Sequence, residues 1–149
     1  SRPLAAMPAP RFVLSRWQLW STALKTIAAN PILGVGPDNF RLLYGPYAGL
    51  EIWDRSYHSN NLYLEFFVGT GVLGGSLFLW LLWKLLWILH RQWKLASHQT
   101  LPHALGGSAA ILAILVHGFF DYFLEFTPTY LMIWSSLGLA VAALRLEEE

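Results

Sequence analysis

The residue types best suited to chemistry stand in "SYHSNN", Ser56 to Asn61, directly ahead of a long apolar segment. The imidazole of His58 has an unperturbed pKa of about 6.5, so it can accept a proton near neutral pH. Asn60 and Asn61 cannot act as bases, although their amides donate and accept hydrogen bonds. Two interpretations stay open: His58 is a catalytic or substrate-contacting residue, or it orients a loop in which Ser59, Asn60 or Asn61 caps the next helix.

A second candidate pair lies later in the chain, at the end of another apolar run. His117 and Asp121 are four residues apart, so on a helix they share a face and can pair. Ionisable groups at the depth of a membrane favour a functional role, with a purely structural pair as the alternative. The chain has no Cys, and the spacing of its other His residues resembles no metal motif. We therefore predict neither a metal site nor a cofactor.

The composition of the chain indicates a membrane protein. Of 149 residues, 55 % are apolar, only 13 % are charged and eight are Trp. Average proteins have about 45–50 % apolar and about 25 % charged residues. The net charge of +1 offers no basic surface, which excludes nucleic acid as a partner.

Three apolar runs predict three transmembrane helices, at about 71–89, 104–120 and 129–144. The first run has nineteen residues, which at about 1.5 Å per residue matches about 30 Å of hydrocarbon. Its one charge, Lys84, lies five residues from the end of the run, so the ammonium group can reach the nearer interface.

Charges in the short loops predict the orientation of these helices. The loop after the first run carries Arg91 and Lys94 without an acid, which places it in the cytoplasm. The loop after the second run carries Asp121 and Glu125 without a base, which places it outside. Alternation then puts residues 1–70 outside the cytoplasm and leaves a short cytoplasmic tail after the third helix. Residues 1–11 are expected to be a linker or the edge of a longer protein.

The outer segment, residues 12–70, begins with a predicted amphipathic helix over residues 12–29. Ser15 is a candidate cap, and Asn30 with Pro31 is the stop. The apolar face is expected to pack on other helices or lie in the membrane interface, and it comprises Val13, Trp17, Trp20, Leu24, Ile27 and Ala28. The predicted fold is an all-α membrane protein: three transmembrane helices preceded by an amphipathic helix and an extracytoplasmic loop.

Three stretches resemble the C-terminal part of the O-antigen ligase and O-antigen polymerase superfamily. They are "RWQLWSTALKTIAANPILGVGPDNF", "HSNNLYLEFFVGTGVLGG" and "HGFFDYFLEFTPTYLMIWSSLGL". The resemblance implies a multi-pass enzyme of the bacterial inner (cytoplasmic) membrane whose outer loop faces the periplasm or the cell exterior. It also implies that the chain corresponds to the last third of such an enzyme.

The resemblance further implies a glycosyltransferase. Its partners would be a polyprenyl-diphosphate-linked glycan as donor, a lipid or glycan acceptor with a sugar hydroxyl, and membrane lipids. Two alternatives remain: a polymerase of the same superfamily that joins glycan repeat units, and a non-catalytic or degenerate membrane scaffold.

At the polar stretch the chain departs from the family pattern. Asn61, Gly71 and Gly74 fit the family spacing, so the position of the family's catalytic His is held by Asn60. Some relatives carry a second His two residues upstream, and His58 matches that position. The resemblance therefore implies that His58 is the catalytic base, with Asn60 and Asn61 as substrate contacts.

The resemblance also suggests how the donor diphosphate is held. Arg16 matches the family's helix Arg and is the first candidate, because Arg pairs bidentately with phosphate. Arg41 and Arg55 are reserve candidates, with solvated surface charges as the alternative. His117 and Asp121 match a late His and Asp of the family and are expected close behind. We expect Arg16 and His58 to face one outer cavity.

Overall fold

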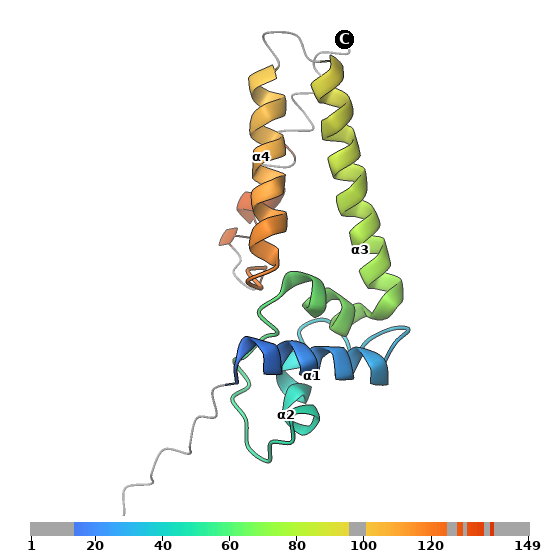
Figure 1. The fold of residues 1–149 in the computed structure, drawn as a ribbon, viewed down its shortest axis with the longest axis vertical. Helices are drawn as coiled ribbons and strands as arrows, with labels where there is room; N and C mark the ends of the chain where they lie inside the picture. Colours follow the sequence, from blue (N-terminus) through green and yellow to red (C-terminus); the bar gives the residue numbers. More distant parts are fainter. Residues whose placement is uncertain (1–13, 96–100, 125–127, 130, 136–137, 139–149) are drawn as a thin grey trace, which may run out of the picture.

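The computed structural model describes residues 14–95, 101–124, 128–129, 131–135 and 138. These ranges contain no strand, and the fold is all-helical. The helices are α1 (Arg16–Ala29), α2 (Phe40–Ala48), α3 (Leu62–Leu95) and α4 (Leu101–Gly118). The long part of α3 and α4 stand side by side, while α1 and α2 lie across their base (Figure 1).

Helix α1 begins at Arg16, four residues later than predicted, with the candidate cap Ser15 in front of it, and it ends before Asn30 as predicted. Ser15 Oγ accepts the backbone N–H of Gln18 at 3.4 Å, and Gln18 Oε1 accepts the backbone N–H of Ser15 at 2.8 Å. This capping box satisfies two of the amides that a helix start leaves unpaired. At the other end, the N–H of Asn30 donates to the carbonyls of Thr26 and Ile27.

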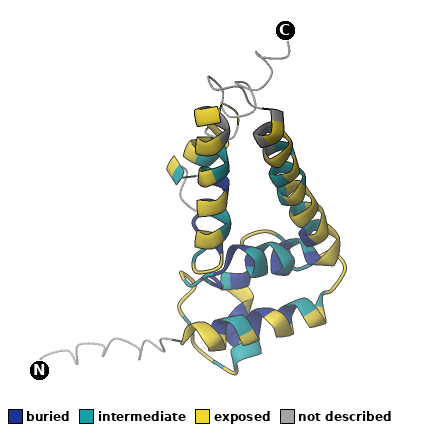
Figure 2. Cartoon of the chain, turned by 45° about the horizontal axis from the view of Figure 1, so that its top comes forward, coloured by how far each residue is buried: buried dark blue, intermediate teal, exposed yellow. Residues whose placement is uncertain are grey.

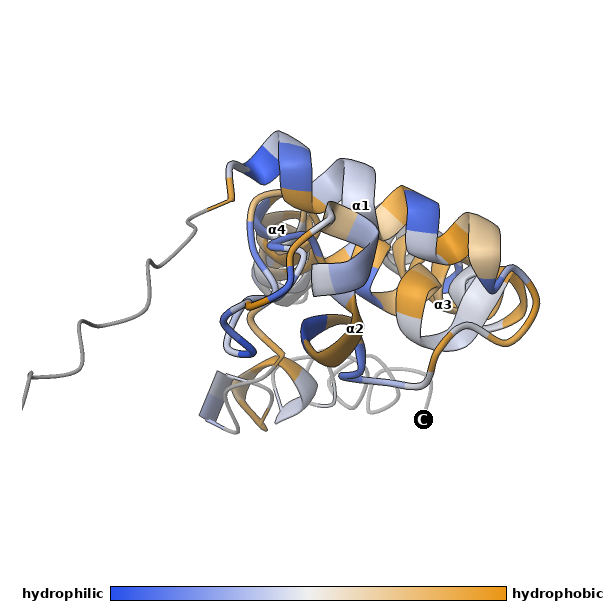
Figure 3. Cartoon of the chain, turned by 90° about the horizontal axis from the view of Figure 1, so that it is seen from below, coloured by the Kyte–Doolittle hydropathy of each residue, from blue (hydrophilic) through white to orange (hydrophobic). Residues whose placement is uncertain are grey.

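The buried face of α1 differs from the predicted apolar face. It consists of Leu19, Thr22, Ala23 and Thr26, whereas Trp17 is 76 % exposed. The two Thr hydroxyls can be buried because each donates to the carbonyl four residues earlier, at 2.7 and 2.9 Å. Helix α1 therefore leaves hydrophobic patches on its outside, next to hydrophilic ones (Figure 3).

Helix α2 was not predicted, since this stretch was expected to be loop. Phe40 and Tyr44 of α2 are fully buried and pack with Leu19 and Ala23 of α1 and Val68 of α3. Figure 2 shows this core as the dark blue region where α1, α2 and the start of α3 meet.

Helix α3 bends at Gly71, where φ is 66° and ψ is −169°. Residues 62–70 lie across the base, and residues 72–95 stand upright (Figure 1). The bend breaks the hydrogen-bond ladder of the helix, and the loop after α1 replaces the missing partners. Four backbone bonds of 2.7 to 3.4 Å join the segments 31–36 and 68–73: Val35 to Val68, Gly36 to Gly69, Val72 to Pro31, and Leu73 to Ile32.

One of the three predicted transmembrane helices meets the length and composition of a span. Residues Leu62–Ile88 of α3 are apolar enough, and only 22 % of the most apolar window is buried inside the structure, unlike a typical core helix of a soluble protein. The apolar part of α4, Leu105–Gly118, is shorter. The third predicted helix, 129–144, lies mostly outside the described residues; its described positions 129, 131–135 and 138 are helical.

Candidate functional site

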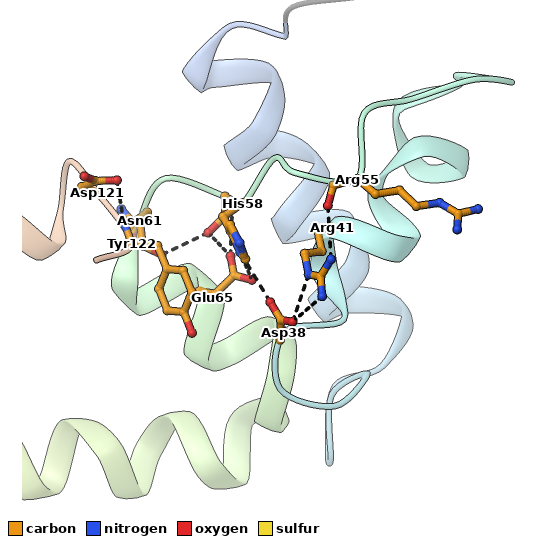
Figure 4. A network of polar contacts seen from close by, with 9 residues as sticks. Asp38, Arg41, Arg55, His58, Asn61, Glu65, Asp121 and Tyr122 are labelled. Carbon is orange, nitrogen blue, oxygen red and sulfur yellow. Dashed lines mark hydrogen bonds and ion pairs between the residues drawn. The ribbon is translucent and has the colours of Figure 1, made fainter. Parts of the chain in front are cut away.

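His58 lies in the loop between α2 and α3 and is only 5 % exposed. Its Nδ1 is 3.4 Å from Oε1 of Glu65 and 3.9 Å from Oδ1 of Asp38. Its ring lies 5.0 Å from the ring of Tyr122, which follows α4. Four parts of the chain thus supply this polar cluster of His58, Glu65, Asp38 and Tyr122 (Figure 4).

Glu65 is the most enclosed carboxylate of the cluster, with 3 % of its side chain exposed. Its Oε2 accepts the backbone N–H of Ser59 at 3.0 Å and the Ser59 hydroxyl at 2.6 Å. Glu65 also stands in the first turn of α3, where the helix dipole stabilises a negative charge. A carboxylate facing Nδ1 of His58 favours the tautomer of the neutral ring that carries its proton on Nδ1 and leaves Nε2 as the basic nitrogen.

Glu65 has no role among those predicted from the sequence. The signal that was available is modest: it is the one charged residue between Arg55 and Lys84, in the first turn of a helix that starts just after His58. Its contact with the imidazole depends on the path of the loop from His58 to Asn61.

Asp38 is held beside His58 by a tight turn and by Arg41. Its φ of 64° lies in the left-handed region, which Asp tolerates better than most residues. Arg41 donates from Nε and Nη2 to Oδ2 of Asp38, at 2.9 and 2.8 Å. These hydrogen bonds lower the pKa of Asp38 below its usual range, against a smaller opposing effect of burial. Asp38 is therefore a carboxylate at neutral pH, and Arg41 is engaged with it.

The other two candidate cations contact groups outside the polar cluster. The guanidinium of Arg55 points away from it and lies 5.8 Å over the ring of Trp53 (Figure 4). Arg16 is exposed and donates from Nη1 to the backbone carbonyl of Phe120, at the end of α4. A cation at a helix C-terminus is favoured by the dipole.

Asn60 and Asn61 have different local roles. Asn60 adopts φ of 50°, again a left-handed conformation, and is half-buried. Asn61 caps α3, because its Oδ1 accepts the N–H of Leu64 at 3.0 Å. Its Nδ2 donates to the carbonyl of Phe119 at 3.1 Å. Of the three residues considered as caps, Asn61 is the one whose side chain makes the capping bond.

His117 and Asp121 form the predicted pair, with a long distance between the nitrogen and the oxygen. Nε2 of His117 is 3.9 Å from Oδ2 of Asp121, and both side chains are more than half exposed. Oδ1 of Asp121 accepts the backbone N–H of Tyr122 at 2.8 Å, so Asp121 shapes the turn that carries Tyr122 toward His58.

The segment 119–122 connects most of these candidates. Asn61 bonds to Phe119, Arg16 bonds to Phe120, and His58 contacts Tyr122. That Arg16 and His58 share one cavity stays a prediction. The cavity beside Asp38, Glu65 and Tyr122 has a volume of about 80 Å³, well below the range of about 300–1,000 Å³ that is usual for small-molecule sites. Among the described residues, no three His, Cys, Asp or Glu side chains are grouped to hold a metal ion.

The model of the O-antigen ligase family matches residues 12–79. This segment belongs to the O-antigen ligase family. The family is membrane-associated, in keeping with the candidate span in α3. The match includes α1, α2, the bend at Gly71 and three members of the polar cluster; α4 and Tyr122 lie beyond it. No curated protein and no solved structure matches the chain significantly.

Proposed function

We propose that this chain forms part of a membrane glycosyltransferase that moves a glycan from a polyprenyl-diphosphate carrier to a sugar hydroxyl. The observation that carries the proposal is the buried imidazole of His58 beside Glu65, within a segment of the O-antigen ligase family. A carboxylate that fixes the tautomer and direction of an imidazole is the arrangement by which proteins position a general base.

In the proposed reaction the acceptor hydroxyl gives its proton to Nε2 of His58 as its oxygen attacks the anomeric carbon of the donor. The bond between this carbon and the diphosphate oxygen breaks, and the diphosphate leaves with the electron pair. His58 then releases its proton to solvent. General-base assistance of this kind contributes about 10²- to 10⁴-fold in rate.

The leaving diphosphate requires a cation, and Arg16 remains our first candidate. Its guanidinium is exposed, and its bond to the Phe120 carbonyl can be exchanged for a charge-assisted bond to phosphate, which is stronger. Arg55 is the better of the two reserve candidates, since Arg41 is engaged with Asp38. Asn60, His117 and Asp121 remain proposed substrate contacts. For Asn61 the capping bond supports a structural role in addition.

We further propose that residues 14–70 lie on the outer side of the bacterial inner membrane. The lipid carrier and a water-soluble acceptor meet only at such an interface. The loop beyond α3 would then lie in the cytoplasm, as its cations predict.

The test is transfer from a defined lipid-linked glycan by the full-length protein. We expect His58→Ala to lower turnover by about 100-fold or more. His90→Ala, at the far end of α3, is the matched control and should leave turnover unchanged. If His58→Ala retains full turnover, His58 is not the base. If the unsubstituted protein neither binds nor turns over the lipid-linked glycan, a non-catalytic scaffold becomes the better description.

A polymerase of the same superfamily is the second candidate, because the family match covers ligases and polymerases alike. The products separate the two. Chains that lengthen on the lipid carrier indicate a polymerase, and transfer to a final acceptor indicates a ligase.

A further inference from the structure

Two carboxylates face the same nitrogen of His58, and they are anchored differently. Oε1 of Glu65 is 3.4 Å from Nδ1, and Oδ1 of Asp38 is 3.9 Å from it. The second oxygen of Glu65 accepts hydrogen bonds from the backbone N–H and the hydroxyl of Ser59, which are both neutral. The second oxygen of Asp38 accepts two N–H groups of the Arg41 guanidinium. A cation therefore balances the charge of Asp38, whereas neutral groups hold the charge of Glu65.

The two carboxylates affect the proton of the imidazole. A carboxylate within about 4–6 Å favours the charged form of a neighbouring His, and a second uncompensated carboxylate favours it more strongly. An imidazole that is already protonated cannot accept the proton of a hydroxyl, so a general base must be largely neutral at the working pH. An imidazole with two carboxylates beside it can therefore act as a base more readily when a positive charge balances one of them.

The charged and titratable groups around the His58 ring come from three parts of the chain. They are Glu65 of α3, Asp38 of the turn before α2, and Tyr122 after α4, with Asp121 next to it in the chain (Figure 4). Arg16 of α1 is bound at the end of α4, and the guanidinium of Arg55 points away from the ring (Figure 4). Arg41 of α2 is the cation that forms a salt bridge with one of the two carboxylates.

We propose that Arg41 is a positioning residue that sets the charge state of His58 through Asp38, and that it is not a ligand of the donor diphosphate. This inference rests on the proposed reaction, in which His58 is the base. The hydrogen bonds from Arg41 lower the pKa of Asp38 below its usual range, so Asp38 carries its charge throughout the pH range in which an imidazole titrates. Loss of the guanidinium would leave that charge uncompensated beside the ring.

The test uses the purified full-length protein and variants that change each charge in turn. Arg41→Gln leaves Asp38 uncompensated, and Arg41→Lys restores a cation. Asp38→Asn removes the negative charge, and Asn tolerates the left-handed backbone at this position as Asp does. The double variant Asp38→Asn with Arg41→Gln removes both charges. Lys25→Gln, which removes an exposed cation of α1, is the matched control.

Two readouts follow the imidazole of His58. The first is the pH at which the ring is half protonated, measured by NMR on protein with isotope-labelled His and assigned by the signal that His58→Ala removes. The second is the acidic limb of the pH profile of kcat in the transfer assay. The first readout needs no turnover, so it tests the charge effect apart from the proposed reaction.

We expect Arg41→Gln to move both values to higher pH by about half a unit to one unit, because half of the Asp38 side chain is exposed and water screens its charge. Asp38→Asn should move both values to lower pH, since it leaves the Arg41 charge near the ring. The double variant should return them close to those of the unsubstituted protein. Arg41→Lys and Lys25→Gln should leave them nearly unchanged. A purely structural role of Arg41 would not produce shifts of opposite sign that cancel.

Other outcomes separate this inference from the proposed reaction. If Arg41→Gln raises the KM for the lipid-linked glycan at every pH and moves neither value, Arg41 is a substrate contact and the inference is wrong. If no variant moves either value while His58→Ala abolishes transfer, the inference is wrong and the reaction stands. If the NMR values move as expected but no transfer occurs, the charge effect stands and the reaction is wrong. Should Arg41→Gln fail to fold, Asp38→Asn decides alone, because the absence of its shift to lower pH would overturn the inference.

Discussion

Among single residues, His58 stands out because several side chains surround its ring. Glu65 faces Nδ1, Asp38 lies next to it, and Tyr122 packs on the ring. Asn60, at the position where the resemblance to the family implies a His, is instead half-buried in a left-handed conformation. The imidazole two residues upstream is thus the one in contact with an orienting carboxylate, which supports its proposed role as the base.

We predict that Glu65 acts through His58. Glu65→Gln keeps the shape of the side chain but removes the charge that orients the ring, so kcat should fall at least about tenfold while KM changes little. Glu51→Gln, on an exposed carboxylate of the loop between α2 and α3, is the control and should be neutral.

The decisive measurement is the double variant His58→Ala with Glu65→Gln. Residues that work as a unit give non-additive losses, so the second substitution should add almost nothing to the first. Independent, additive losses would show that Glu65 supports the fold or contacts substrate by another route.

At the scale of elements, the bend of α3 and the loop after α1 are one structure. Gly34 and Gly71 both have positive φ and approach each other closely: a Cβ on Gly71 would lie 2.2 Å from the carbonyl oxygen of Ile32, and one on Gly34 would lie 2.4 Å from that of Val68. The four backbone bonds between the segments thus require glycine on both sides. This contact turns the upright part of α3 away from the base that carries Glu65.

Gly71→Ala and Gly34→Ala should each lower the free energy of unfolding by more than about 2 kcal/mol. Each introduces both a strained backbone and a clash with backbone atoms, which cannot move aside as a side chain can. Thermal unfolding of the purified full-length protein measures the effect.

Gly106→Ala is the matched control for these variants. A Cβ on Gly106 meets nothing within 4 Å, and Ala is the better helix former, so this variant should be neutral or slightly stabilising. Equal stability of the Gly71 and Gly106 variants would contradict the inferred requirement for glycine where the segments 31–36 and 68–73 meet.

At the scale of the whole molecule, charge is distributed unequally between the end that holds the polar cluster and the far end of α3. No Asp or Glu occurs between Glu65 and Asp121, whereas this stretch contains Lys84, Arg91 and Lys94. Lys84 lies about 20 Å along α3 from Gly71, and its Nζ is 5.2 to 5.8 Å from the rings of three Trp residues. Those rings can stabilise the ammonium group near an interface. The end of α3 opposite the polar cluster therefore has the charge expected of a cytoplasmic side.

The proposed orientation can be tested directly because the chain has no native Cys. Glu51→Cys lies on an exposed part of the loop between α2 and α3, and His90→Cys lies at the far end of α3. In cells whose outer membrane is permeabilised and whose inner membrane is intact, a membrane-impermeant maleimide should label the first variant. It should label the second variant only after the inner membrane is also permeabilised. The reverse pattern would place the polar cluster in the cytoplasm and contradict the proposed function.

Properties that depend on neighbours along the chain could be predicted from the amino-acid sequence. Helicity, the start of α1 after Ser15 and the apolar length of α3 follow from capping, periodicity and composition, which act within one or two turns. The family followed from ordered motifs, and the match over residues 12–79 confirms it.

Contacts between distant residues became known only from the folded chain. His58 contacts Tyr122, and Asn61 bonds to Phe119, across more than fifty residues of chain. The burial of Thr22 on α1 and the formation of α2 depend in the same way on partners from other elements. Such contacts have no local pattern, because they arise when the bend at Gly71 and the turn after α1 bring distant segments together, and packing then overrides local preference. The role of Glu65 beside His58 became visible for this reason only in the folded chain.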